Sequence, residues 1–238
     1  ADGRHPVGNA VDGHELGLHV GRESRIRRSA QADCLQALRG NQTDRIALDE
    51  IKLLCIADTQ STILAYKTGE VDAAEFANFY VSTLRGRSPV QWQPMRQQFL
   101  RERIVPRIPQ AALDLVAGHQ HAGDMVVLTT ATNRFLTELT AQHLGIAHVI
   151  ATEPQLVDGQ FSGATEGVLN MRGGKVLRLH AWLQARGDQL QDFDSTGYSD
   201  SINDLPLLEA VDHAVVVHAD ARLAAIAAER GWRSLKLG

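Results

Sequence analysis

The stretch STGYSDSINDLPLLEAV, residues 195–211, contains a short strand candidate, an acidic loop and a helix candidate in direct succession. The chain on both sides of this stretch also alternates strand and helix candidates. Strands that alternate with helices predict a parallel sheet with helices on both faces, because right-handed crossovers return each strand to the same sheet. We therefore expect an α/β fold built on a doubly wound parallel sheet.

This alternation runs from about residue 124 to the end of the sequence. Short apolar runs predict strands at 124–130, 148–153, 195–200, 213–219 and 232–237. Apolar spacing of three to four residues predicts helices at 134–145, 173–187, 203–211 and 220–231. A hairpin-like stretch, QLVDGQFSGAT, occupies 155–165. Ligands of such sheets bind beyond the carboxyl ends of the strands, so we expect the functional residues in the loops that follow them.

The first part of the chain has a different organisation. Residues 51–57, IKLLCIA, form a buried-strand candidate that ends at the polar cluster DTQST, and residues 66–118 have helical spacing throughout. We predict a core made of 45–65 and 119–238, with 66–118 as a truncated helical cap and its return to the core. Residues 1–44 are rich in Gly, Arg and His and predict a poorly packed extension. A loosely ordered arm and an artefactual upstream start of the reading frame would both give this composition.

Composition excludes several classes of function. The 238 residues are 44% hydrophobic and carry a formal charge of -4, so there is no basic excess to bind nucleic acid. Apolar runs fall short of the roughly 18 residues of a membrane span, and the first residues do not have the pattern of a secretory signal. With Cys34 and Cys55 as the only cysteines, we expect a reducing cytoplasm, and no cysteine-based metal cluster.

Four loops at predicted strand ends or helix starts carry residues suited to phosphoryl chemistry. They are Asp58–Thr62, Thr129–Asn133, the helix start at Lys175, and Tyr198–Asp204. A carboxylate can attack phosphorus, hydroxyl groups can hold phosphate oxygens, an ammonium can offset negative charge, and a further carboxylate can bind Mg²⁺. Together they contain the components of an aspartate-based phosphotransfer site.

At these residues the sequence resembles the haloacid dehalogenase superfamily, in its phosphoserine-phosphatase-like branch. Thr130 in VLTTATNRF, Lys175 in RGGKVLRL, and Asp200 with Asp204 in YSDSINDLPLLE are similar to three of the four signatures of that family. YKTGE at 66–70 and IATEP at 150–154 also look like stretches seen in this branch. The resemblance runs from about Tyr66 to Leu237.

The resemblance implies a role for each of these residues in hydrolysis of a small phosphomonoester. Asp58 would attack phosphorus and form an aspartyl phosphate, while Thr130 would bind a phosphate oxygen and Lys175 would neutralise charge. Asp58 and Asp200 would be the carboxylate ligands of Mg²⁺, and Asp204 would orient that metal site. The implied contacts to the substrate are Thr62, Asn133 and Asn203. The expected partner is a small phosphorylated metabolite, and a homodimer is compatible with these roles.

The first signature departs from the family pattern. In the best alignment Gln60 stands where the family has its acid/base aspartate, and glutamine cannot transfer a proton. Asp49 is a second nucleophile candidate with a weaker strand before it. Asp192–Thr196, DFDST, spells the signature literally, but no apolar strand precedes it, so we interpret this match as chance.

Alternative readings stay open beside the phosphatase. A catalytically impaired relative would still bind phosphate or Mg²⁺ without efficient turnover. A response-regulator-like acceptor shares the Asp, Thr and Lys chemistry, but it lacks a cap and does not need SDSIND. Structural roles compete residue by residue: Asp200 and Asp204 could cap a helix, Lys175 could be a solvated helix-start residue, and Thr130 could satisfy strand-end backbone groups.

Overall fold

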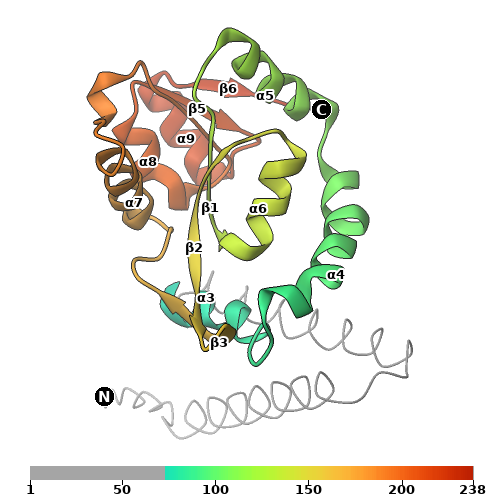
Figure 1. Cartoon of the computed structure of the whole chain (residues 1–238). Helices are drawn as coiled ribbons and strands as arrows, with labels where there is room; N and C mark the ends of the chain where they lie inside the picture. The colour runs from blue at the N-terminus through green and yellow to red at the C-terminus, as the bar shows by residue number, and fades with distance from the viewer. Residues whose placement is uncertain (1–72, 238) are drawn as a thin grey trace, which may run out of the picture. The chain divides into compact units, whose positions relative to one another are not determined.

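The computed structural model describes residues 73–237, which lie in the second of the two units into which the chain divides, Asp72–Gly238 (Figure 1). The predicted strand 51–57, the N-terminal extension, and Asp49, Asp58, Gln60 and Thr62 all lie outside the described residues. Every contact reported below therefore belongs to the second unit.

The first sheet has the order β1-β2-β3. Its strands are β1 (Val127–Asn133), β2 (His148–Val157) and β3 (Gln160–Glu166). β1 and β2 are parallel and in regular register from Val127↔His148 to Thr130↔Ala151, and α6 (Arg134–His143) connects them. β3 returns antiparallel along the distal half of β2, from Glu153 onward. The predicted parallel strand pair and the hairpin after it are therefore present.

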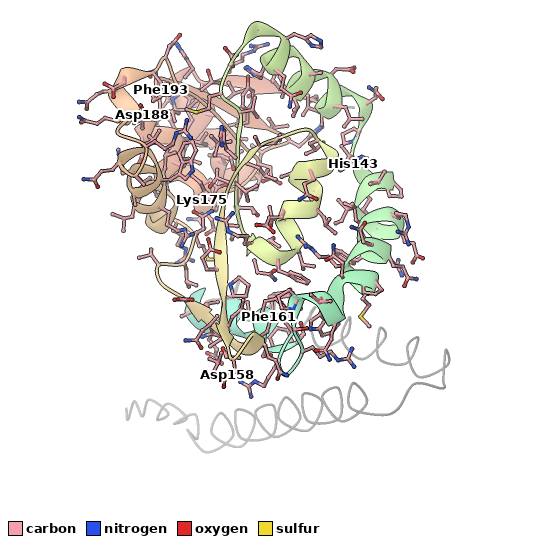
Figure 2. The ribbon with its side chains drawn as sticks, viewed as in Figure 1. His143, Asp158, Phe161, Lys175, Asp188 and Phe193 are labelled. Carbon is pink, nitrogen blue, oxygen red and sulfur yellow. The ribbon has the colours of Figure 1, made fainter. Side chains whose placement is uncertain are left out.

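The hairpin turn follows from its sequence. Asp158 and Gly159 have φ values of 52° and 75°, and they connect the pair Val157↔Gln160. Two successive residues with positive φ form the tight turn that matches the twist of antiparallel strands, and Asp-Gly is among the pairs that adopt it most readily. Figure 2 labels Asp158 at this turn and Phe161 just beyond it on β3. The Phe161 ring packs edge-on against that of Phe135 in α6, with centroids 5.0 Å apart.

The second sheet is entirely parallel, with the order β4-β5-β6. Its elements are β4 (Thr196–Ser199), η4 (Ile202–Asp204), α8 (Leu205–Ala210), β5 (His213–Val217), α9 (Ala221–Arg230) and β6 (Arg233–Leu235). A buried apolar cluster holds this half together. It consists of Leu208, Ala214, Val216, Leu223 and Ala227, with Ile202 and Trp232 packed against it. Because Ile202 belongs to the SDSIND loop, the core fixes the middle of that loop.

The described part of the helical block precedes β1. It comprises α3 (Ala73–Ser82), α4 (Pro89–Phe99), η1 (Leu100–Ile104), η2 (Val105–Arg107) and α5 (Gln110–Ala122). α3 packs against β3, where the Asn78 Oδ1 accepts hydrogen bonds from the backbone and hydroxyl of Thr165. α4 contacts α6, and the Arg96 guanidinium lies 4.3 Å from the centre of the Phe135 ring. The boundary predicted between a cap and the core stays a prediction.

Two connections link the parts of the described unit that carry the two sheets. α7 (Gly173–Gln184) contacts both β2 and α8 (Figure 1). The His119 ring, at the end of α5, bonds Asp124 through Nδ1 at 2.7 Å and the Tyr198 hydroxyl of β4 through Nε2 at 2.8 Å. The described helices and strands confirm the predicted α/β fold. Among the described residues, none of the helices is long and apolar enough to cross a membrane.

Candidate active site

Lys175 is the most constrained of the predicted site residues. It lies in the first turn of α7, where it is only 6% exposed (Figure 2). Its Nζ donates to Asp204 Oδ2 at 2.6 Å, and both side chains of this ion pair are largely buried. Removing an ammonium from water is costly, and a close carboxylate offsets that cost. The solvated helix-start role is therefore wrong for Lys175.

The same Asp204 oxygen accepts a second hydrogen bond. The Ser199 hydroxyl, at the end of β4, donates to Oδ2 at 2.8 Å. The backbone N–H of Ser201 then donates to the Ser199 oxygen, and that of Asn203 to the Ser201 hydroxyl oxygen. This chain of short side-chain-to-backbone bonds fixes the loop in one conformation. Asp204 is thus a counter-ion of Lys175, and its side chain makes no capping bond to α8.

Asp200 occupies the exposed start of this loop. Its carbonyl accepts the backbone N–H of Asp220 at 3.1 Å, and the Asp220 carboxylate accepts that of Ile202 at 2.9 Å. Asp220 also caps α9 through Oδ1, which accepts from the backbones of Arg222 and Leu223. These bonds, led by the one from Leu223, lower the pKa of the Asp220 carboxyl. One carboxylate therefore fixes both the start of α9 and the loop at 200–204.

Thr130 lies where β1 departs from its regular register. After the pair Thr130↔Ala151 the next pair is Asn133↔Thr152, so β1 has two additional residues and β2 has none. The Thr130 Oγ1 accepts the backbone N–H of Thr132 at 3.2 Å. Because this bond uses the oxygen as an acceptor, the hydroxyl hydrogen can still be donated to an anion.

Asn133 and Asn203, two predicted substrate contacts, each have a bonding role within the protein. The Asn133 Oδ1 caps α6 by accepting from the Leu136 backbone at 3.1 Å, and this residue is buried. The Asn203 Oδ1 accepts from Arg172 Nε at 3.3 Å. Arg172 has a φ of 51°, which is uncommon for a residue other than glycine. The contacts of both asparagines with substrate stay predictions.

Asn170 is a residue that the sequence reasoning missed. It is fully buried, and its Nδ2 lies within hydrogen-bond distance of Thr129 Oγ1 and of the carbonyls of Thr130 and Ile150. Its own backbone N–H donates to the Thr152 hydroxyl. A lone polar residue five positions before a predicted lysine has no signature in sequence, so only the contacts identify it.

The oxygen ligands present fit a magnesium ion. Asp200 offers an exposed carboxylate, and Mg²⁺ prefers such hard oxygen donors together with water. Asp204 has one oxygen committed to Lys175 and Ser199, which suits the indirect, orienting role predicted for it. Within residues 73–237 no three His, Cys, Asp or Glu side chains form a cluster that could hold a metal ion.

The structure brings together Lys175 and Asp204 directly, and Asn170 connects Thr130 to the segment that begins α7. Asp58 and Thr62 lie outside the described residues, so their predicted roles stay predictions. The literal match at 192–196 has other contacts: Asp194 bonds the His213 ring and Ser195 bonds Asp212.

A pocket of about 380 Å³ between β2 and α7 has Arg134, Arg178 and Trp182 among its lining residues but none of the predicted site residues.

The sequence model of the haloacid dehalogenase-like hydrolases matches residues 30–209 of this chain. The chain belongs to this family. The predicted resemblance to this family is confirmed, and so is the expectation of a hydrolase. The roles of Thr130, Lys175, Asp200 and Asp204 stay predictions.

Individual relatives support the same assignment. A histidinol-phosphatase from Neisseria meningitidis is 36% identical over 169 residues, which cover 70% of this chain and 76% of the relative. The phosphoserine phosphatase SerB1 of Mycobacterium tuberculosis is 32% identical over 166 residues, but the match spans only 53% of its length. A solved structure of a protein of unknown function from Bordetella pertussis Tohama I is 36% identical. It superimposes with a TM-score of 0.76, covering 88% of this chain and 91% of that one.

Replacing Lys175 tests the buried ion pair. Lys175→Met leaves the Asp204 carboxylate without its cation, and we expect the free energy of unfolding to fall by about 3–5 kcal/mol. Adding Asp204→Asn removes the stranded charge, so the double variant is expected to be more stable than Lys175→Met alone. Urea denaturation followed by circular dichroism measures both. If the losses of Lys175→Met and Asp204→Asn simply add, the two side chains are not coupled.

Replacing Asp220 tests the hydrogen bond by which its carboxylate holds the loop at 200–204. Asp220→Ala removes the cap of α9 and the bond to Ile202, and at pH 7 we expect a loss of about 1–2 kcal/mol of unfolding free energy. The folded state lowers the pKa of this carboxyl, so its contribution is present above its unfolded pKa of about 3.9 and is lost as pH falls through the folded value. The difference in unfolding free energy between native and Asp220→Ala should therefore shrink below about pH 4.

Asp220→Asn, which retains a capping oxygen, is the control. A loss that is the same at pH 7 and pH 3 would contradict this assignment.

Proposed function

We propose that this protein is a Mg²⁺-dependent phosphatase that hydrolyses a small phosphomonoester through an aspartyl-phosphate intermediate on Asp58. The observation that carries the proposal is the buried Lys175 ammonium, held by Asp204 next to the loop that contains Asp200. A buried cation beside an acidic, oxygen-rich loop is suited to a dianionic substrate and a divalent metal. The phosphatase names of the Neisseria and Mycobacterium relatives support this reaction class.

The first half of the reaction transfers the phosphoryl group to the protein. The Asp58 carboxylate oxygen attacks phosphorus, and the bond from phosphorus to the leaving oxygen breaks with its electron pair going to that oxygen. The Thr130 hydroxyl donates to a phosphate oxygen, and the Lys175 ammonium reduces the repulsion between the carboxylate and the phosphate. The leaving oxygen takes a proton from solvent. In the second half, a water oxygen attacks phosphorus and that water gives a proton to solvent. The bond to Asp58 breaks with its electron pair returning to the carboxylate, and inorganic phosphate leaves.

The metal would be held by Asp200 together with Asp58. When bound, Mg²⁺ supplies positive charge that offsets the charge of the transferring phosphoryl group. Asp204 acts through its partners, because it fixes the position of Lys175 and, through Ser199, that of the loop. Lys175 thus contributes charge at a position that the protein fixes in advance.

Gln60 limits the rate in this proposal. Protonation of the leaving oxygen by an acid contributes about 10²–10⁴-fold in rate, and glutamine cannot supply that proton. Substrates with a low-pKa leaving group need it least. The second candidate function follows from the same residue: a catalytically impaired member that binds phosphate and Mg²⁺ with little turnover.

The names of two relatives give the first substrates to test, histidinol phosphate and phosphoserine. We propose a small phosphorylated metabolite as the partner. We also propose the cytoplasm as the site of action, since a chain of this size with two cysteines does not depend on disulfides. A homodimer is compatible with this function.

Turnover of p-nitrophenyl phosphate with and without Mg²⁺ tests the proposal. We expect Mg²⁺-dependent release of p-nitrophenol by the native chain, its loss in Asp58→Asn, and a decrease of roughly 100-fold in Asp200→Asn. Gln60→Asp should raise turnover of phosphoserine by up to about 10²–10⁴-fold. Asp188, a partly exposed carboxylate that follows α7 and pairs with Arg186, gives the control Asp188→Asn, with an unchanged rate. Equal rates for Asp200→Asn and Asp188→Asn would refute the metal site, and an unaltered rate for Asp58→Asn would refute the nucleophile.

A further inference from the structure

The β1–β2 ladder is interrupted beside Thr130. In the proposed function, the hydroxyl of this residue donates to a phosphate oxygen of the substrate. A regular parallel ladder satisfies the carbonyls of both strands, but here β1 has two additional residues between Thr130 and Asn133. Carbonyls at such an interruption need other donors, because a buried polar group without a partner is costly. Bulges of this kind also change where a side chain is aimed, and they occur frequently beside active sites.

A single buried amide donates to both strands beside this interruption. The Asn170 Nδ2 lies 2.8 Å from the Thr130 carbonyl on β1, 2.8 Å from the Ile150 carbonyl on β2, and 3.0 Å from Thr129 Oγ1. An amide nitrogen has two hydrogens, so one of them is shared between two acceptors. The opposite orientation of the amide would place Oδ1 against two carbonyls. In the observed orientation Oδ1 is buried without a hydrogen-bond partner among the described residues.

The backbone around Asn170 is fixed as firmly as its side chain. Its N–H donates to the Thr152 hydroxyl at 3.2 Å, which ties the segment to β2. At Gly174 a Cβ atom would overlap the carbonyl oxygen of Leu169, so the chain turns back on itself with no room for a side chain. Lys175 follows at once and bonds Asp204. The segment 169–175 therefore links Thr130 of β1 to the start of α7.

From this geometry we infer that Asn170 is a positioning residue for the reaction. Its amide holds the interrupted end of β1 so that the Thr130 hydroxyl is presented to the phosphate, in register with Lys175. It acts through Thr130 and does not itself touch substrate. This inference rests on the proposed phosphatase function for its kinetic consequence, but the geometry it assigns can be measured without turnover.

A double-mutant cycle between Asn170 and Thr130 tests the inference kinetically. With p-nitrophenyl phosphate and Mg²⁺, Asn170→Ala in the full chain should lower kcat/KM by about 10- to 100-fold, the loss typical of a misplaced reacting group. In a Thr130→Ala background the same change should cost less than about threefold, because the hydroxyl that Asn170 positions is already gone. An equal loss in both backgrounds would overturn the inference. Asn170→Ser, which retains one donor, should lie between native and Asn170→Ala.

Gln120 provides the matched control. Its side-chain amide also donates to two backbone carbonyls, those of Leu144 and Gly145, but it lies on α5 away from Thr130. Gln120→Ala should leave kcat/KM unchanged in both backgrounds. A kinetic loss in Gln120→Ala as large as that in Asn170→Ala would mean that any lost amide contact affects the rate, which would also overturn the inference.

Hydrogen exchange separates this inference from the proposed function. The Thr132 N–H, which donates to Thr130 Oγ1, should exchange at least tenfold faster in Asn170→Ala and at the native rate in Gln120→Ala. If the native chain does not turn over p-nitrophenyl phosphate, the phosphatase proposal fails while faster exchange at Thr132 still supports the positioning. Native exchange at Thr132 in both Asn170→Ala and Asn170→Ser would overturn the positioning, whatever the activity.

Discussion

The ion pair between Lys175 and Asp204 is the interaction on which the arrangement of the site depends. It joins the first turn of α7 to the loop that follows β4, at a distance of 2.6 Å and with both side chains largely withdrawn from water. A surface pair would contribute little, but a buried pair strongly constrains geometry because neither charge can be left alone. The position of the ammonium is therefore set by the protein before any substrate binds.

Two further constraints act on either side of this pair. The Asp220 carboxylate holds the Asp200 loop against the start of α9, and the Ile202 side chain fixes the same loop to the apolar core. On the other side, Asn170 ties the segment leading to Lys175 to Thr130 of β1 and Ile150 of β2. The site residues come from distant parts of the sequence, and short hydrogen-bonded segments determine their positions.

Much of this arrangement could be predicted from the sequence, because it depends on local patterns. Periodicity predicted the order of helices and strands from α3 onward, and the stretch at 155–165 was recognisable as a hairpin. The loop at Asp200 and Asp204 was recognisable because a strand, a compact acidic motif and a helix follow one another directly. Each of these signals lies within about ten residues of sequence.

The interactions that could not be predicted depend on contacts between distant residues. Asn133 was predicted as a substrate contact from its place in the sequence. In the structure its side chain caps α6. Asn170 has no motif around it, and its importance comes from an irregularity of the β1–β2 ladder that no periodicity reveals. The pairing of Lys175 with Asp204 joins residues 29 apart, and the resemblance gave each a role without giving the bond.

We propose that Thr130, Lys175 and Asp200 bind one phosphate and one divalent cation between them. The most direct test is a crystal structure of the full chain with inorganic phosphate and Mn²⁺ in place of Mg²⁺, with the metal located by its anomalous scattering. We expect a phosphate within hydrogen-bond distance of both Thr130 Oγ1 and Lys175 Nζ, with Mn²⁺ bound to the Asp200 carboxylate. A phosphate bound away from Lys175, or a metal held by residues other than Asp200, would contradict it.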